Sequence, residues 1–285
     1  MGQARQTAER LQLGLTLQRH RLAAGVAQQD AANAIGRSAG RLSQVENGKG
    51  ALGLDELVRL LDLYGVTSSD RETILSLGKA SRRRQPRAGY LDTLPDSYLR
   101  FTDMLAAAKR IGYYEAGVMP GIVQSEPYIR ALMDAASAVR SEAETAERIE
   151  FRLQSQRRVF ELGNAEQIDI VFTEETLLRV VGDEAVMSQQ VVYLLGLLDQ
   201  HPHLEVRIVP LSVGNNPLLG GGLVSLEFEN ATMITFAPAV WGPSQYFDQP
   251  ADTGPMRRLF AAAQDIALSP QDSRGALIRF LARST

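Results

Sequence analysis

The chain of 285 residues contains no cysteine, so disulfide bonds and thiolate metal sites are excluded. It also lacks a long apolar run: the longest, residues 191–198, is far shorter than the roughly 20 residues of a membrane-spanning helix. The first thirty residues carry charges throughout and contain no apolar segment typical of a signal peptide. We therefore expect a soluble, cytoplasmic protein without a membrane partner.

The net charge is small, but its distribution along the chain is uneven. Residues 1–90 contain 14 Lys and Arg against 8 Asp and Glu, a net charge of +6, whereas the remainder has 16 against 25, a net charge of −9. The length favours two or three domains. A basic first part with an acidic remainder is expected when only the first domain faces phosphate groups.

The most informative segment is residues 25–49, GVAQQDAANAIGRSAGRLSQVENGK, which predicts two short helices joined by a glycine turn. The first helix is expected over residues 28–35, where apolar side chains recur on one face. Gly36 suits the turn because glycine adopts positive φ without a Cβ clash. Ser38 is expected to cap the second helix, residues 39–46, which ends at a glycine.

Apolar stripes before and after this segment, and a capping box of Ser69 and Glu72, predict a five-helix unit over residues 11–77. A unit of this kind binds DNA by placing the second helix of the motif in the major groove. Arg41 and Gln44 are the expected base readers, because Arg pairs with guanine and Gln with adenine. The residues expected to contact DNA are Gln28, Ser38, Ala39, Gly40, Arg41, Ser43, Gln44, Asn47 and Lys49.

The motif resembles the Xre/Cro family of lambda-repressor-like domains. The residues that carry the resemblance are Gly25, Val26, Gln28, Ala32, Gly36 and the run Glu46-Asn47-Gly48. The sequence departs from the family at Ala27, where Ser or Thr is usual, and at Ala39 and Gly40, where longer base-reading side chains often stand. The resemblance implies a DNA-binding transcriptional regulator.

The chain is expected to contain a helix-turn-helix domain over residues 1–77, a basic linker over 78–93 and a regulatory domain over 94–285. The run Arg82-Arg83-Arg84 in the linker is either solvated or in contact with DNA phosphates. The fold class is multidomain: an all-α domain followed by an α/β (α+β) domain with a small mixed sheet. The elements expected in the second domain are helices over 95–110, 126–133, 142–160, 184–200, 254–267 and 272–282, strands over 168–172 and 204–211, and a hairpin over 223–237.

The order of features in the second domain resembles the domain of unknown function that follows Xre-type domains in actinobacterial regulators of the WhiJ-like group. The residues that carry the resemblance are the run Met119-Pro120-Gly121-Ile122-Val123-Gln124-Ser125, Tyr128, Gln156, Arg157, Phe160, the run Glu174-Glu175-Thr176-Leu177-Leu178, Gly182 and the run Val209-Pro210-Leu211. Where this chain has Ile122 and Val123 the family usually has Leu, and where it has Ser125 the family usually has Thr. The resemblance implies a regulator, switched in some members by a small protein encoded nearby.

Three patterns invite a reading as catalytic or ligand sites but have simpler explanations. His201 and His203 share the spacing of metal ligands, but a third ligand is not identifiable in the sequence. The adjacent Glu174 and Glu175 are better explained as a helix start, and residues 220–222 as a flexible glycine loop. We therefore expect no enzymatic activity, no metal and no cofactor.

The sequence thus predicts a regulator that binds a pseudopalindromic operator in double-stranded DNA as a homodimer and responds to a small-molecule ligand or a partner protein. The residues considered for ligand or partner contact are Tyr114, Gln124, Tyr128, Trp241 and Tyr246. The residues considered for the dimer interface are Met256, Leu259, Phe260, Leu277 and Phe280. Two alternatives stay open: a regulator switched only by a small partner protein, and a second domain with an unrecognised enzymatic activity.

Overall fold

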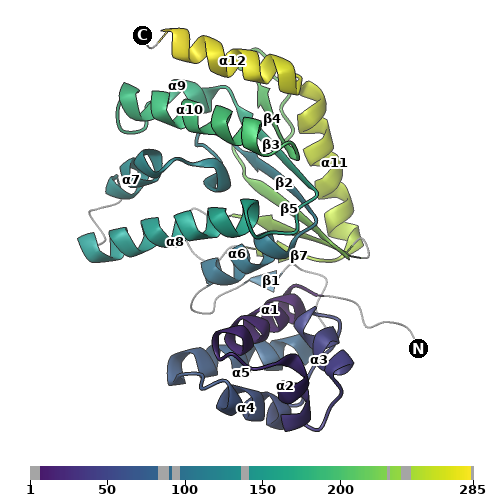
Figure 1. The fold of residues 1–285 in the computed structure, drawn as a ribbon. Helices are drawn as coiled ribbons and strands as arrows, with labels where there is room; N and C mark the ends of the chain where they lie inside the picture. The colour runs from purple at the N-terminus through teal and green to yellow at the C-terminus, as the bar shows by residue number, and fades with distance from the viewer. Residues whose placement is uncertain are drawn as a thin grey trace. The chain divides into compact units, whose positions relative to one another are not determined.

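A computed structural model describes residues 7–82, 90–91, 97–135, 141–229, 232–238 and 245–283 of the chain. The chain divides into two compact units (Figure 1). The first unit comprises residues 1–105 and 239–250, and the second comprises residues 106–238 and 251–285. Five helices open the first unit and a mixed sheet with helices forms the second, which confirms the expected fold class.

The helices of the first unit enclose a single apolar core that includes Leu17, Leu42 and Leu60. They are α1 (Ala8–Ala23), α2 (Gln28–Ala34), α3 (Ala39–Glu46), α4 (Leu54–Leu63) and α5 (Ser68–Arg82). The bounds of α2 and α3 agree with the sequence prediction to within one residue. Helix α5 begins one residue before the expected cap and continues to Arg82, so the first part of the expected linker is helical. Arg83 and Arg84 lie outside the described residues.

Helix α1 passes very close to the end of α3 at Gly14. A Cβ atom at Gly14 would lie 2.4 Å from the carbonyl oxygens of both Val45 and Glu46. No side chain fits at that distance, so glycine is required for the two helices to approach. The periodicity of the sequence did not reveal this position.

The first unit also contains α6 (Ser97–Ala107) and a short antiparallel pair formed by β1 (Tyr90–Leu91) and β7 (Gln245–Phe247). Helix α6 is shorter than the expected helix over 95–110. The chain then enters β2 (Arg110–Glu115), a strand that the sequence pattern did not predict. Polar and apolar residues do not alternate along β2, and Gly112 interrupts the strand pattern. A glycine stands there because the ring of Phe260 packs against the backbone, where a Cβ would lie only 3.0 Å from the ring.

The sheet of the second unit runs in the order β6-β5-β2-β3-β4. Strands β2, β3 (Gln167–Thr173) and β4 (Leu204–Val209) are parallel, whereas β5 (Leu223–Phe228) is antiparallel to β2 and to β6 (Thr232–Ala237). The parallel pair β3–β4 and the hairpin β5–β6 confirm two sequence predictions. Strand β2 lies at the centre and joins the parallel part to the antiparallel part.

Helices cover both faces of this sheet (Figure 1). Helix α11 (Pro250–Ile266) lies on one face, where Phe260 and Ala263 pack with Tyr114 and Val171. Figure 1 shows α7 (Glu126–Asp134), α8 (Glu142–Phe160) and α10 (Glu184–Gln200) on the other side. The remaining elements are the 3-10 helix η1 (Gly121–Val123), α9 (Glu175–Leu178) and α12 (Pro270–Arg283). Phe260 and Leu277, two of the expected interface residues, are buried in the core.

We expect Gly14→Ala to lower the free energy of unfolding by about 1 to 3 kcal/mol, because the added methyl group forces α1 away from α3. The matched control is Gly40→Ala on α3, where a Cβ would meet no atom within 4 Å. Alanine favours a helix over glycine by at most about 1 kcal/mol, so the control should keep or raise stability. Urea denaturation followed by circular dichroism measures both; equal effects would contradict the close approach.

Candidate nucleic-acid interface

The turn and caps of the α2–α3 motif have the predicted geometry. Gly36 has a φ of 69°, and the amide of Arg37 donates to the carbonyl of Ala32 at 2.9 Å. The hydroxyl of Ser38 accepts from the amide of Arg41 at 3.2 Å and so caps α3. Gly48 also has a φ of 69°, which closes the end of α3. These local signals fix the angle between the two helices.

A buried ion pair holds α1 to the end of α3. Arg21 Nε donates to Glu46 Oε1 at 2.7 Å and Arg21 Nη2 donates to Glu46 Oε2 at 3.0 Å. Arg21 Nη1 donates to the carbonyl of Val26 at 3.0 Å, so the guanidinium also ties down the loop before α2. Both side chains are almost fully buried, and the hydrogen bond from Arg21 to the Glu46 carboxylate raises the pKa of Arg21.

Gln28 belongs to the same network. Its Nε2 donates to Glu46 Oε2 at 2.8 Å, and the residue is half-buried. In this position the amide of Gln28 orients α2 against the end of α3. The sequence predicts a DNA contact for Gln28, whereas in the structure its side chain makes a hydrogen bond inside the domain.

A second ion pair joins the turn of the motif to α4. Arg37 Nε lies 2.6 Å from Glu56 Oε1, while Glu56 Oε2 accepts from the amide of Gly53 at 2.6 Å and caps α4. Burial raises the pKa of Glu56, but the hydrogen bonds from Gly53 and Arg37 outweigh burial and leave the pKa below its usual value. Glu56 is therefore charged at neutral pH and holds Arg37 beside α4.

The face of α3 that points away from the core carries the two expected base readers side by side. Gln44 is exposed and Arg41 is half-buried. Arg41 Nη1 donates to Gln44 Oε1 at 3.4 Å, and Arg41 Nη2 donates to the carbonyl of Ala51 at 2.9 Å. The other residues expected at DNA also lie on or beside α3: Ala39, Ser43 and Lys49 are half-buried, and Ser38, Gly40 and Asn47 are exposed.

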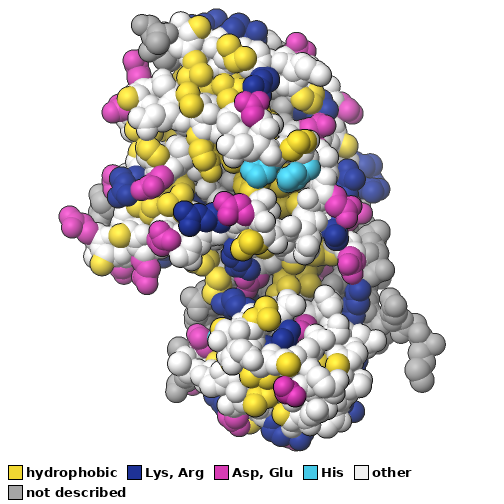
Figure 2. Space-filling model, viewed as in Figure 1, with side chains coloured by type: hydrophobic (Ala, Val, Ile, Leu, Met, Phe, Trp, Pro, Cys, Tyr) yellow, Lys and Arg dark blue, Asp and Glu magenta, His cyan; other side chains and the backbone are white. Residues whose placement is uncertain are grey.

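Basic side chains lie at several points on the visible face of the first unit (Figure 2). In Figure 2 they are separated by polar and hydrophobic atoms on the visible face and do not form one continuous patch.

The tyrosines considered for ligand contact occupy the core. The hydroxyl of Tyr114 accepts from Asn216 Nδ2 at 2.7 Å, and that of Tyr128 accepts from the amide of Met119 at 3.1 Å. Tyr246 is 1% exposed. Trp241 lies outside the described residues. Aromatic residues near turns suggest ligand contact in a sequence, but here three of them pack inside the fold.

Gln124 is buried as well and holds the segment around η1. Its Nε2 donates to the carbonyl of Met119 at 2.7 Å, and its Oε1 accepts from Arg152 Nη1 at 2.8 Å. Gln156 Nε2 donates to the carbonyls of Gly121 and Gln124, both at 2.9 Å. These side chains satisfy the backbone of a segment that lacks regular hydrogen bonding.

Gln190 on α10 makes further hydrogen bonds to the backbone of this segment. The sequence pattern did not single out this residue. Its Nε2 donates to the carbonyl of Val123 at 2.8 Å, and its Oε1 accepts from the amide of Ser125 at 2.7 Å. The residue is fully buried. The available signal was a glutamine at an inward position of an apolar helix. It ties α10 to the start of α7.

Glu115 stands at the carboxyl end of β2, where burial raises the pKa of its carboxyl to about 7. Glu174 begins α9, as expected, and its carboxylate accepts from the amide of Leu211 at 2.9 Å.

The rings of His201 and His203 lie 5.7 Å apart. Burial is the main cause that lowers the pKa of His201, and the charge of the neighbouring His203 lowers it further. Among the described residues, no group of three or more His, Asp and Glu side chains is placed to hold a metal ion. No helix in that part of the chain is long and apolar enough to cross a membrane.

Comparison with known proteins finds a match for each of two parts of the chain. Residues 12–74 match the model of a helix-turn-helix domain. Residues 98–279, more than half of the chain, match a domain of unknown function, DUF5753, and the chain belongs to that family. No curated protein matches the chain.

We expect Glu46→Ala to lower the free energy of unfolding by about 3 to 5 kcal/mol, because it leaves the Arg21 guanidinium buried without its carboxylate. The control is Asp62→Ala, which removes an ion pair to Arg71. The side chain of Asp62 is 62% exposed, so this change should lower the free energy of unfolding by at most about 1 kcal/mol. Thermal and urea unfolding measure both variants. A loss for Glu46→Ala no larger than for Asp62→Ala would show that the buried pair is dispensable.

Proposed function

We propose that this protein is a sequence-specific DNA-binding transcriptional regulator of the Xre/Cro type. The observation that carries the proposal is the α2–turn–α3 geometry, which presents Arg41 and Gln44 together on the outer face of α3. In the proposed complex α3 lies in the major groove of the operator. Arg41 binds guanine and Gln44 binds adenine, each through two hydrogen bonds.

Phosphate contacts position the reading helix in this proposal. Ser38 and the first amides of α3 face the backbone at one end of the helix, and Asn47 and Lys49 face it at the other. Gln28 contributes indirectly through its bond to Glu46, which keeps α2 in place. Contacts of this kind fix orientation without carrying sequence information.

We propose that two copies bind together. Helix α3 has eight residues and begins with Ala39 and Gly40, so one copy offers few base contacts. A two-fold dimer reads a pseudopalindromic operator with half-sites about 34 Å apart. The second unit supplies the interface. Val192 on α10 and Ile278 on α12 are 58% and 51% exposed, and hydrophobic side chains are visible over these two helices in Figure 2.

The second unit is proposed to pass a signal to the DNA-binding helices, from a small ligand or from a small protein encoded nearby as the WhiJ-like resemblance implies. Regulation is favoured over catalysis because Glu174, at the carboxyl edge of the sheet, has a structural role: its carboxylate accepts from the amide of Leu211. Co-purification of a small protein with the full-length chain would favour a partner protein as the signal. Turnover of a bound metabolite would favour the enzymatic alternative.

We expect Arg41→Ala and Gln44→Ala each to weaken binding to the operator by about 1 to 3 kcal/mol and to leave binding to a scrambled duplex almost unchanged. The operator is selected from a random duplex pool with the full-length protein. Fluorescence anisotropy then measures both duplexes. Lys79→Ala, which removes an exposed charge on α5, is the control and should change both affinities little. Equal losses on both duplexes would refute base reading by α3.

We expect the full-length protein to have twice the mass of the 31.2 kDa chain in light scattering. Val192→Asp combined with Ile278→Asp places two charges on the proposed interface and should give a monomer that retains its circular dichroism spectrum. The control is Leu219→Asp, at an exposed position in the loop after β4. A wild-type protein that is monomeric both free and on the operator would refute the dimer.

A further inference from the structure

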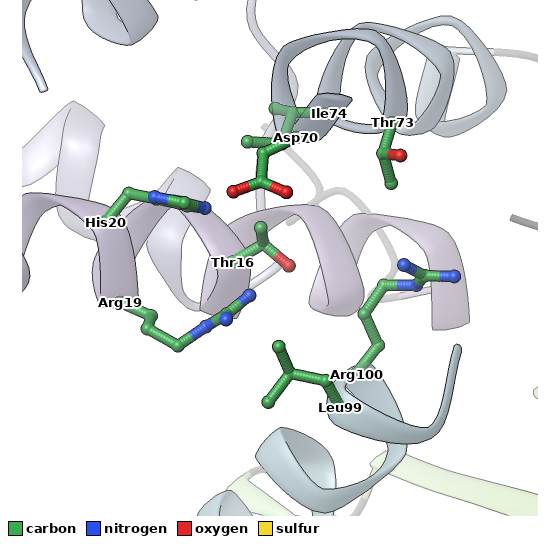
Figure 3. Close-up of a pocket in the computed structure, with 8 residues that line it drawn as sticks. All are labelled: Thr16, Arg19, His20, Asp70, Thr73, Ile74, Leu99 and Arg100. Carbon is green, nitrogen blue, oxygen red and sulfur yellow. The ribbon is translucent and has the colours of Figure 1, made fainter. Parts of the chain in front are cut away.

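A small cavity lies in the first unit, where α1, α5 and α6 meet (Figure 3). It has a volume of about 60 Å³. Its polar lining includes Thr16, Arg19 and His20 from α1, Asp70 from α5 and Arg100 from α6. The cavity is separate from the face of α3 that carries Arg41 and Gln44.

Thr16 has an unsatisfied polar atom at this cavity. The residue is 4% exposed, and its hydroxyl finds no hydrogen-bond partner among the described residues. Figure 3 shows Thr16 between the side chains of Asp70 and Arg19. A buried hydroxyl without a partner destabilises a fold, so such a group points to an occupant that supplies the missing bond.

Two guanidinium groups line the same space. Arg19 Nε lies 3.3 Å from Asp103 Oδ2, and this pair holds Arg19 over the cavity. Arg100 is 2% exposed, so its charge is shielded from bulk water. Planar guanidinium groups bind carboxylate and phosphate oxygens with paired hydrogen bonds. The two guanidinium groups are suited to an oxyanion, although Asp70 lines the cavity as well and Arg19 is paired with Asp103.

The imidazole of His20 lines the cavity beside charged groups. Burial lowers the pKa of His20, Arg19 lowers it further, and Asp70 and Asp103 oppose this change. The lowered pKa favours the neutral imidazole. An anion beside the ring would stabilise the protonated imidazole and raise its pKa.

We propose that this cavity binds a small oxyanion, the phosphate or carboxylate group of a metabolite, through Arg19, Arg100 and the hydroxyl of Thr16. One water needs about 10 to 15 Å³ of such a volume, so the cavity accepts a group of a few heavy atoms. The cavity-lining residues of α1 and α5 lie inside the helix-turn-helix match, whereas Arg100 lies inside the DUF5753 match. An occupant thus contacts both matched regions within one unit.

The regulatory part of this inference rests on the proposed function, but oxyanion binding itself does not. Binding at α1 bears on DNA recognition because α1 also holds α3 through the pair of Arg21 and Glu46. Only three histidines are present in the chain, so the imidazole signals of His20, His201 and His203 can be followed separately by NMR. The substitution His20→Gln assigns the first signal.

We expect sodium phosphate or sodium acetate to shift the His20 signal with a saturable concentration dependence and to raise its titration midpoint. The signals of His201 and His203 serve as internal references and should not shift together with the His20 signal. Sodium chloride at matched ionic strength should have no such effect. Response to acetate alone would identify a carboxylate ligand, and response to phosphate alone a phosphate ligand. A linear response, or one equal in chloride, would overturn the site.

Two variants separate a built site from general anion binding. Thr16→Val keeps the shape of the side chain and removes one hydrogen bond, so it should weaken the anion about fivefold. Arg19→Gln should weaken it about tenfold or more. Gln44→Ala, on the face of α3, is the matched control and should leave the His20 response unchanged. Unchanged affinity in both Thr16→Val and Arg19→Gln would overturn the proposal.

The link to DNA is measured on the selected operator by anisotropy, with the effective anion against chloride at the same ionic strength. We expect the anion to change operator affinity in the wild type and to have a smaller effect in Thr16→Val. A saturable His20 response without any change in affinity would refute the link while the site stands. Absence of operator binding under every condition would instead refute the proposed function.

Discussion

The buried ion pair between Arg21 and Glu46 is the interaction on which the DNA-facing geometry depends. Removal of two charges from water is costly, and the arrangement is stable only when the donors and acceptors of the pair are matched. Here the carboxylate accepts from both Arg21 and Gln28, and the guanidinium also reaches Val26. Because Gly14 lets α1 approach the end of α3, the pair sets the position of α3 and hence the direction of its outer face.

The second unit solves a similar problem with neutral groups. The segment around η1 carries backbone groups that no strand or helix satisfies, and the amides of Gln124, Gln156 and Gln190 satisfy them. Side-chain amides provide both a donor and an acceptor, so one residue can hold two backbone groups. The run that includes Pro120 and Gln124 is therefore explained by folding, and its presence does not by itself indicate a ligand.

The features that could be predicted from the sequence were those with local causes. Gly36, Ser38 and Gly48 act within a few residues of themselves, so the turn, the cap and the end of α3 were readable, and with them the face that carries Arg41 and Gln44. Strand β2 was missed because its pattern is determined by neighbours on both sides. The contacts of Gly14 and Gln190 join positions more than 30 residues apart, and no spacing rule relates them.

The bond from Arg41 to the carbonyl of Ala51 has a consequence for the thermodynamics of recognition. A free arginine side chain loses considerable rotamer freedom when it is immobilised at a base edge. In this protein part of that freedom is already lost in the unbound state, because the loop after α3 holds one end of the guanidinium. In the proposed complex, association with an operator would then carry a smaller conformational entropy penalty at this position. Selectivity would depend on how well the already oriented guanidinium matches the base, and less on a change of the Arg41 rotamer during binding.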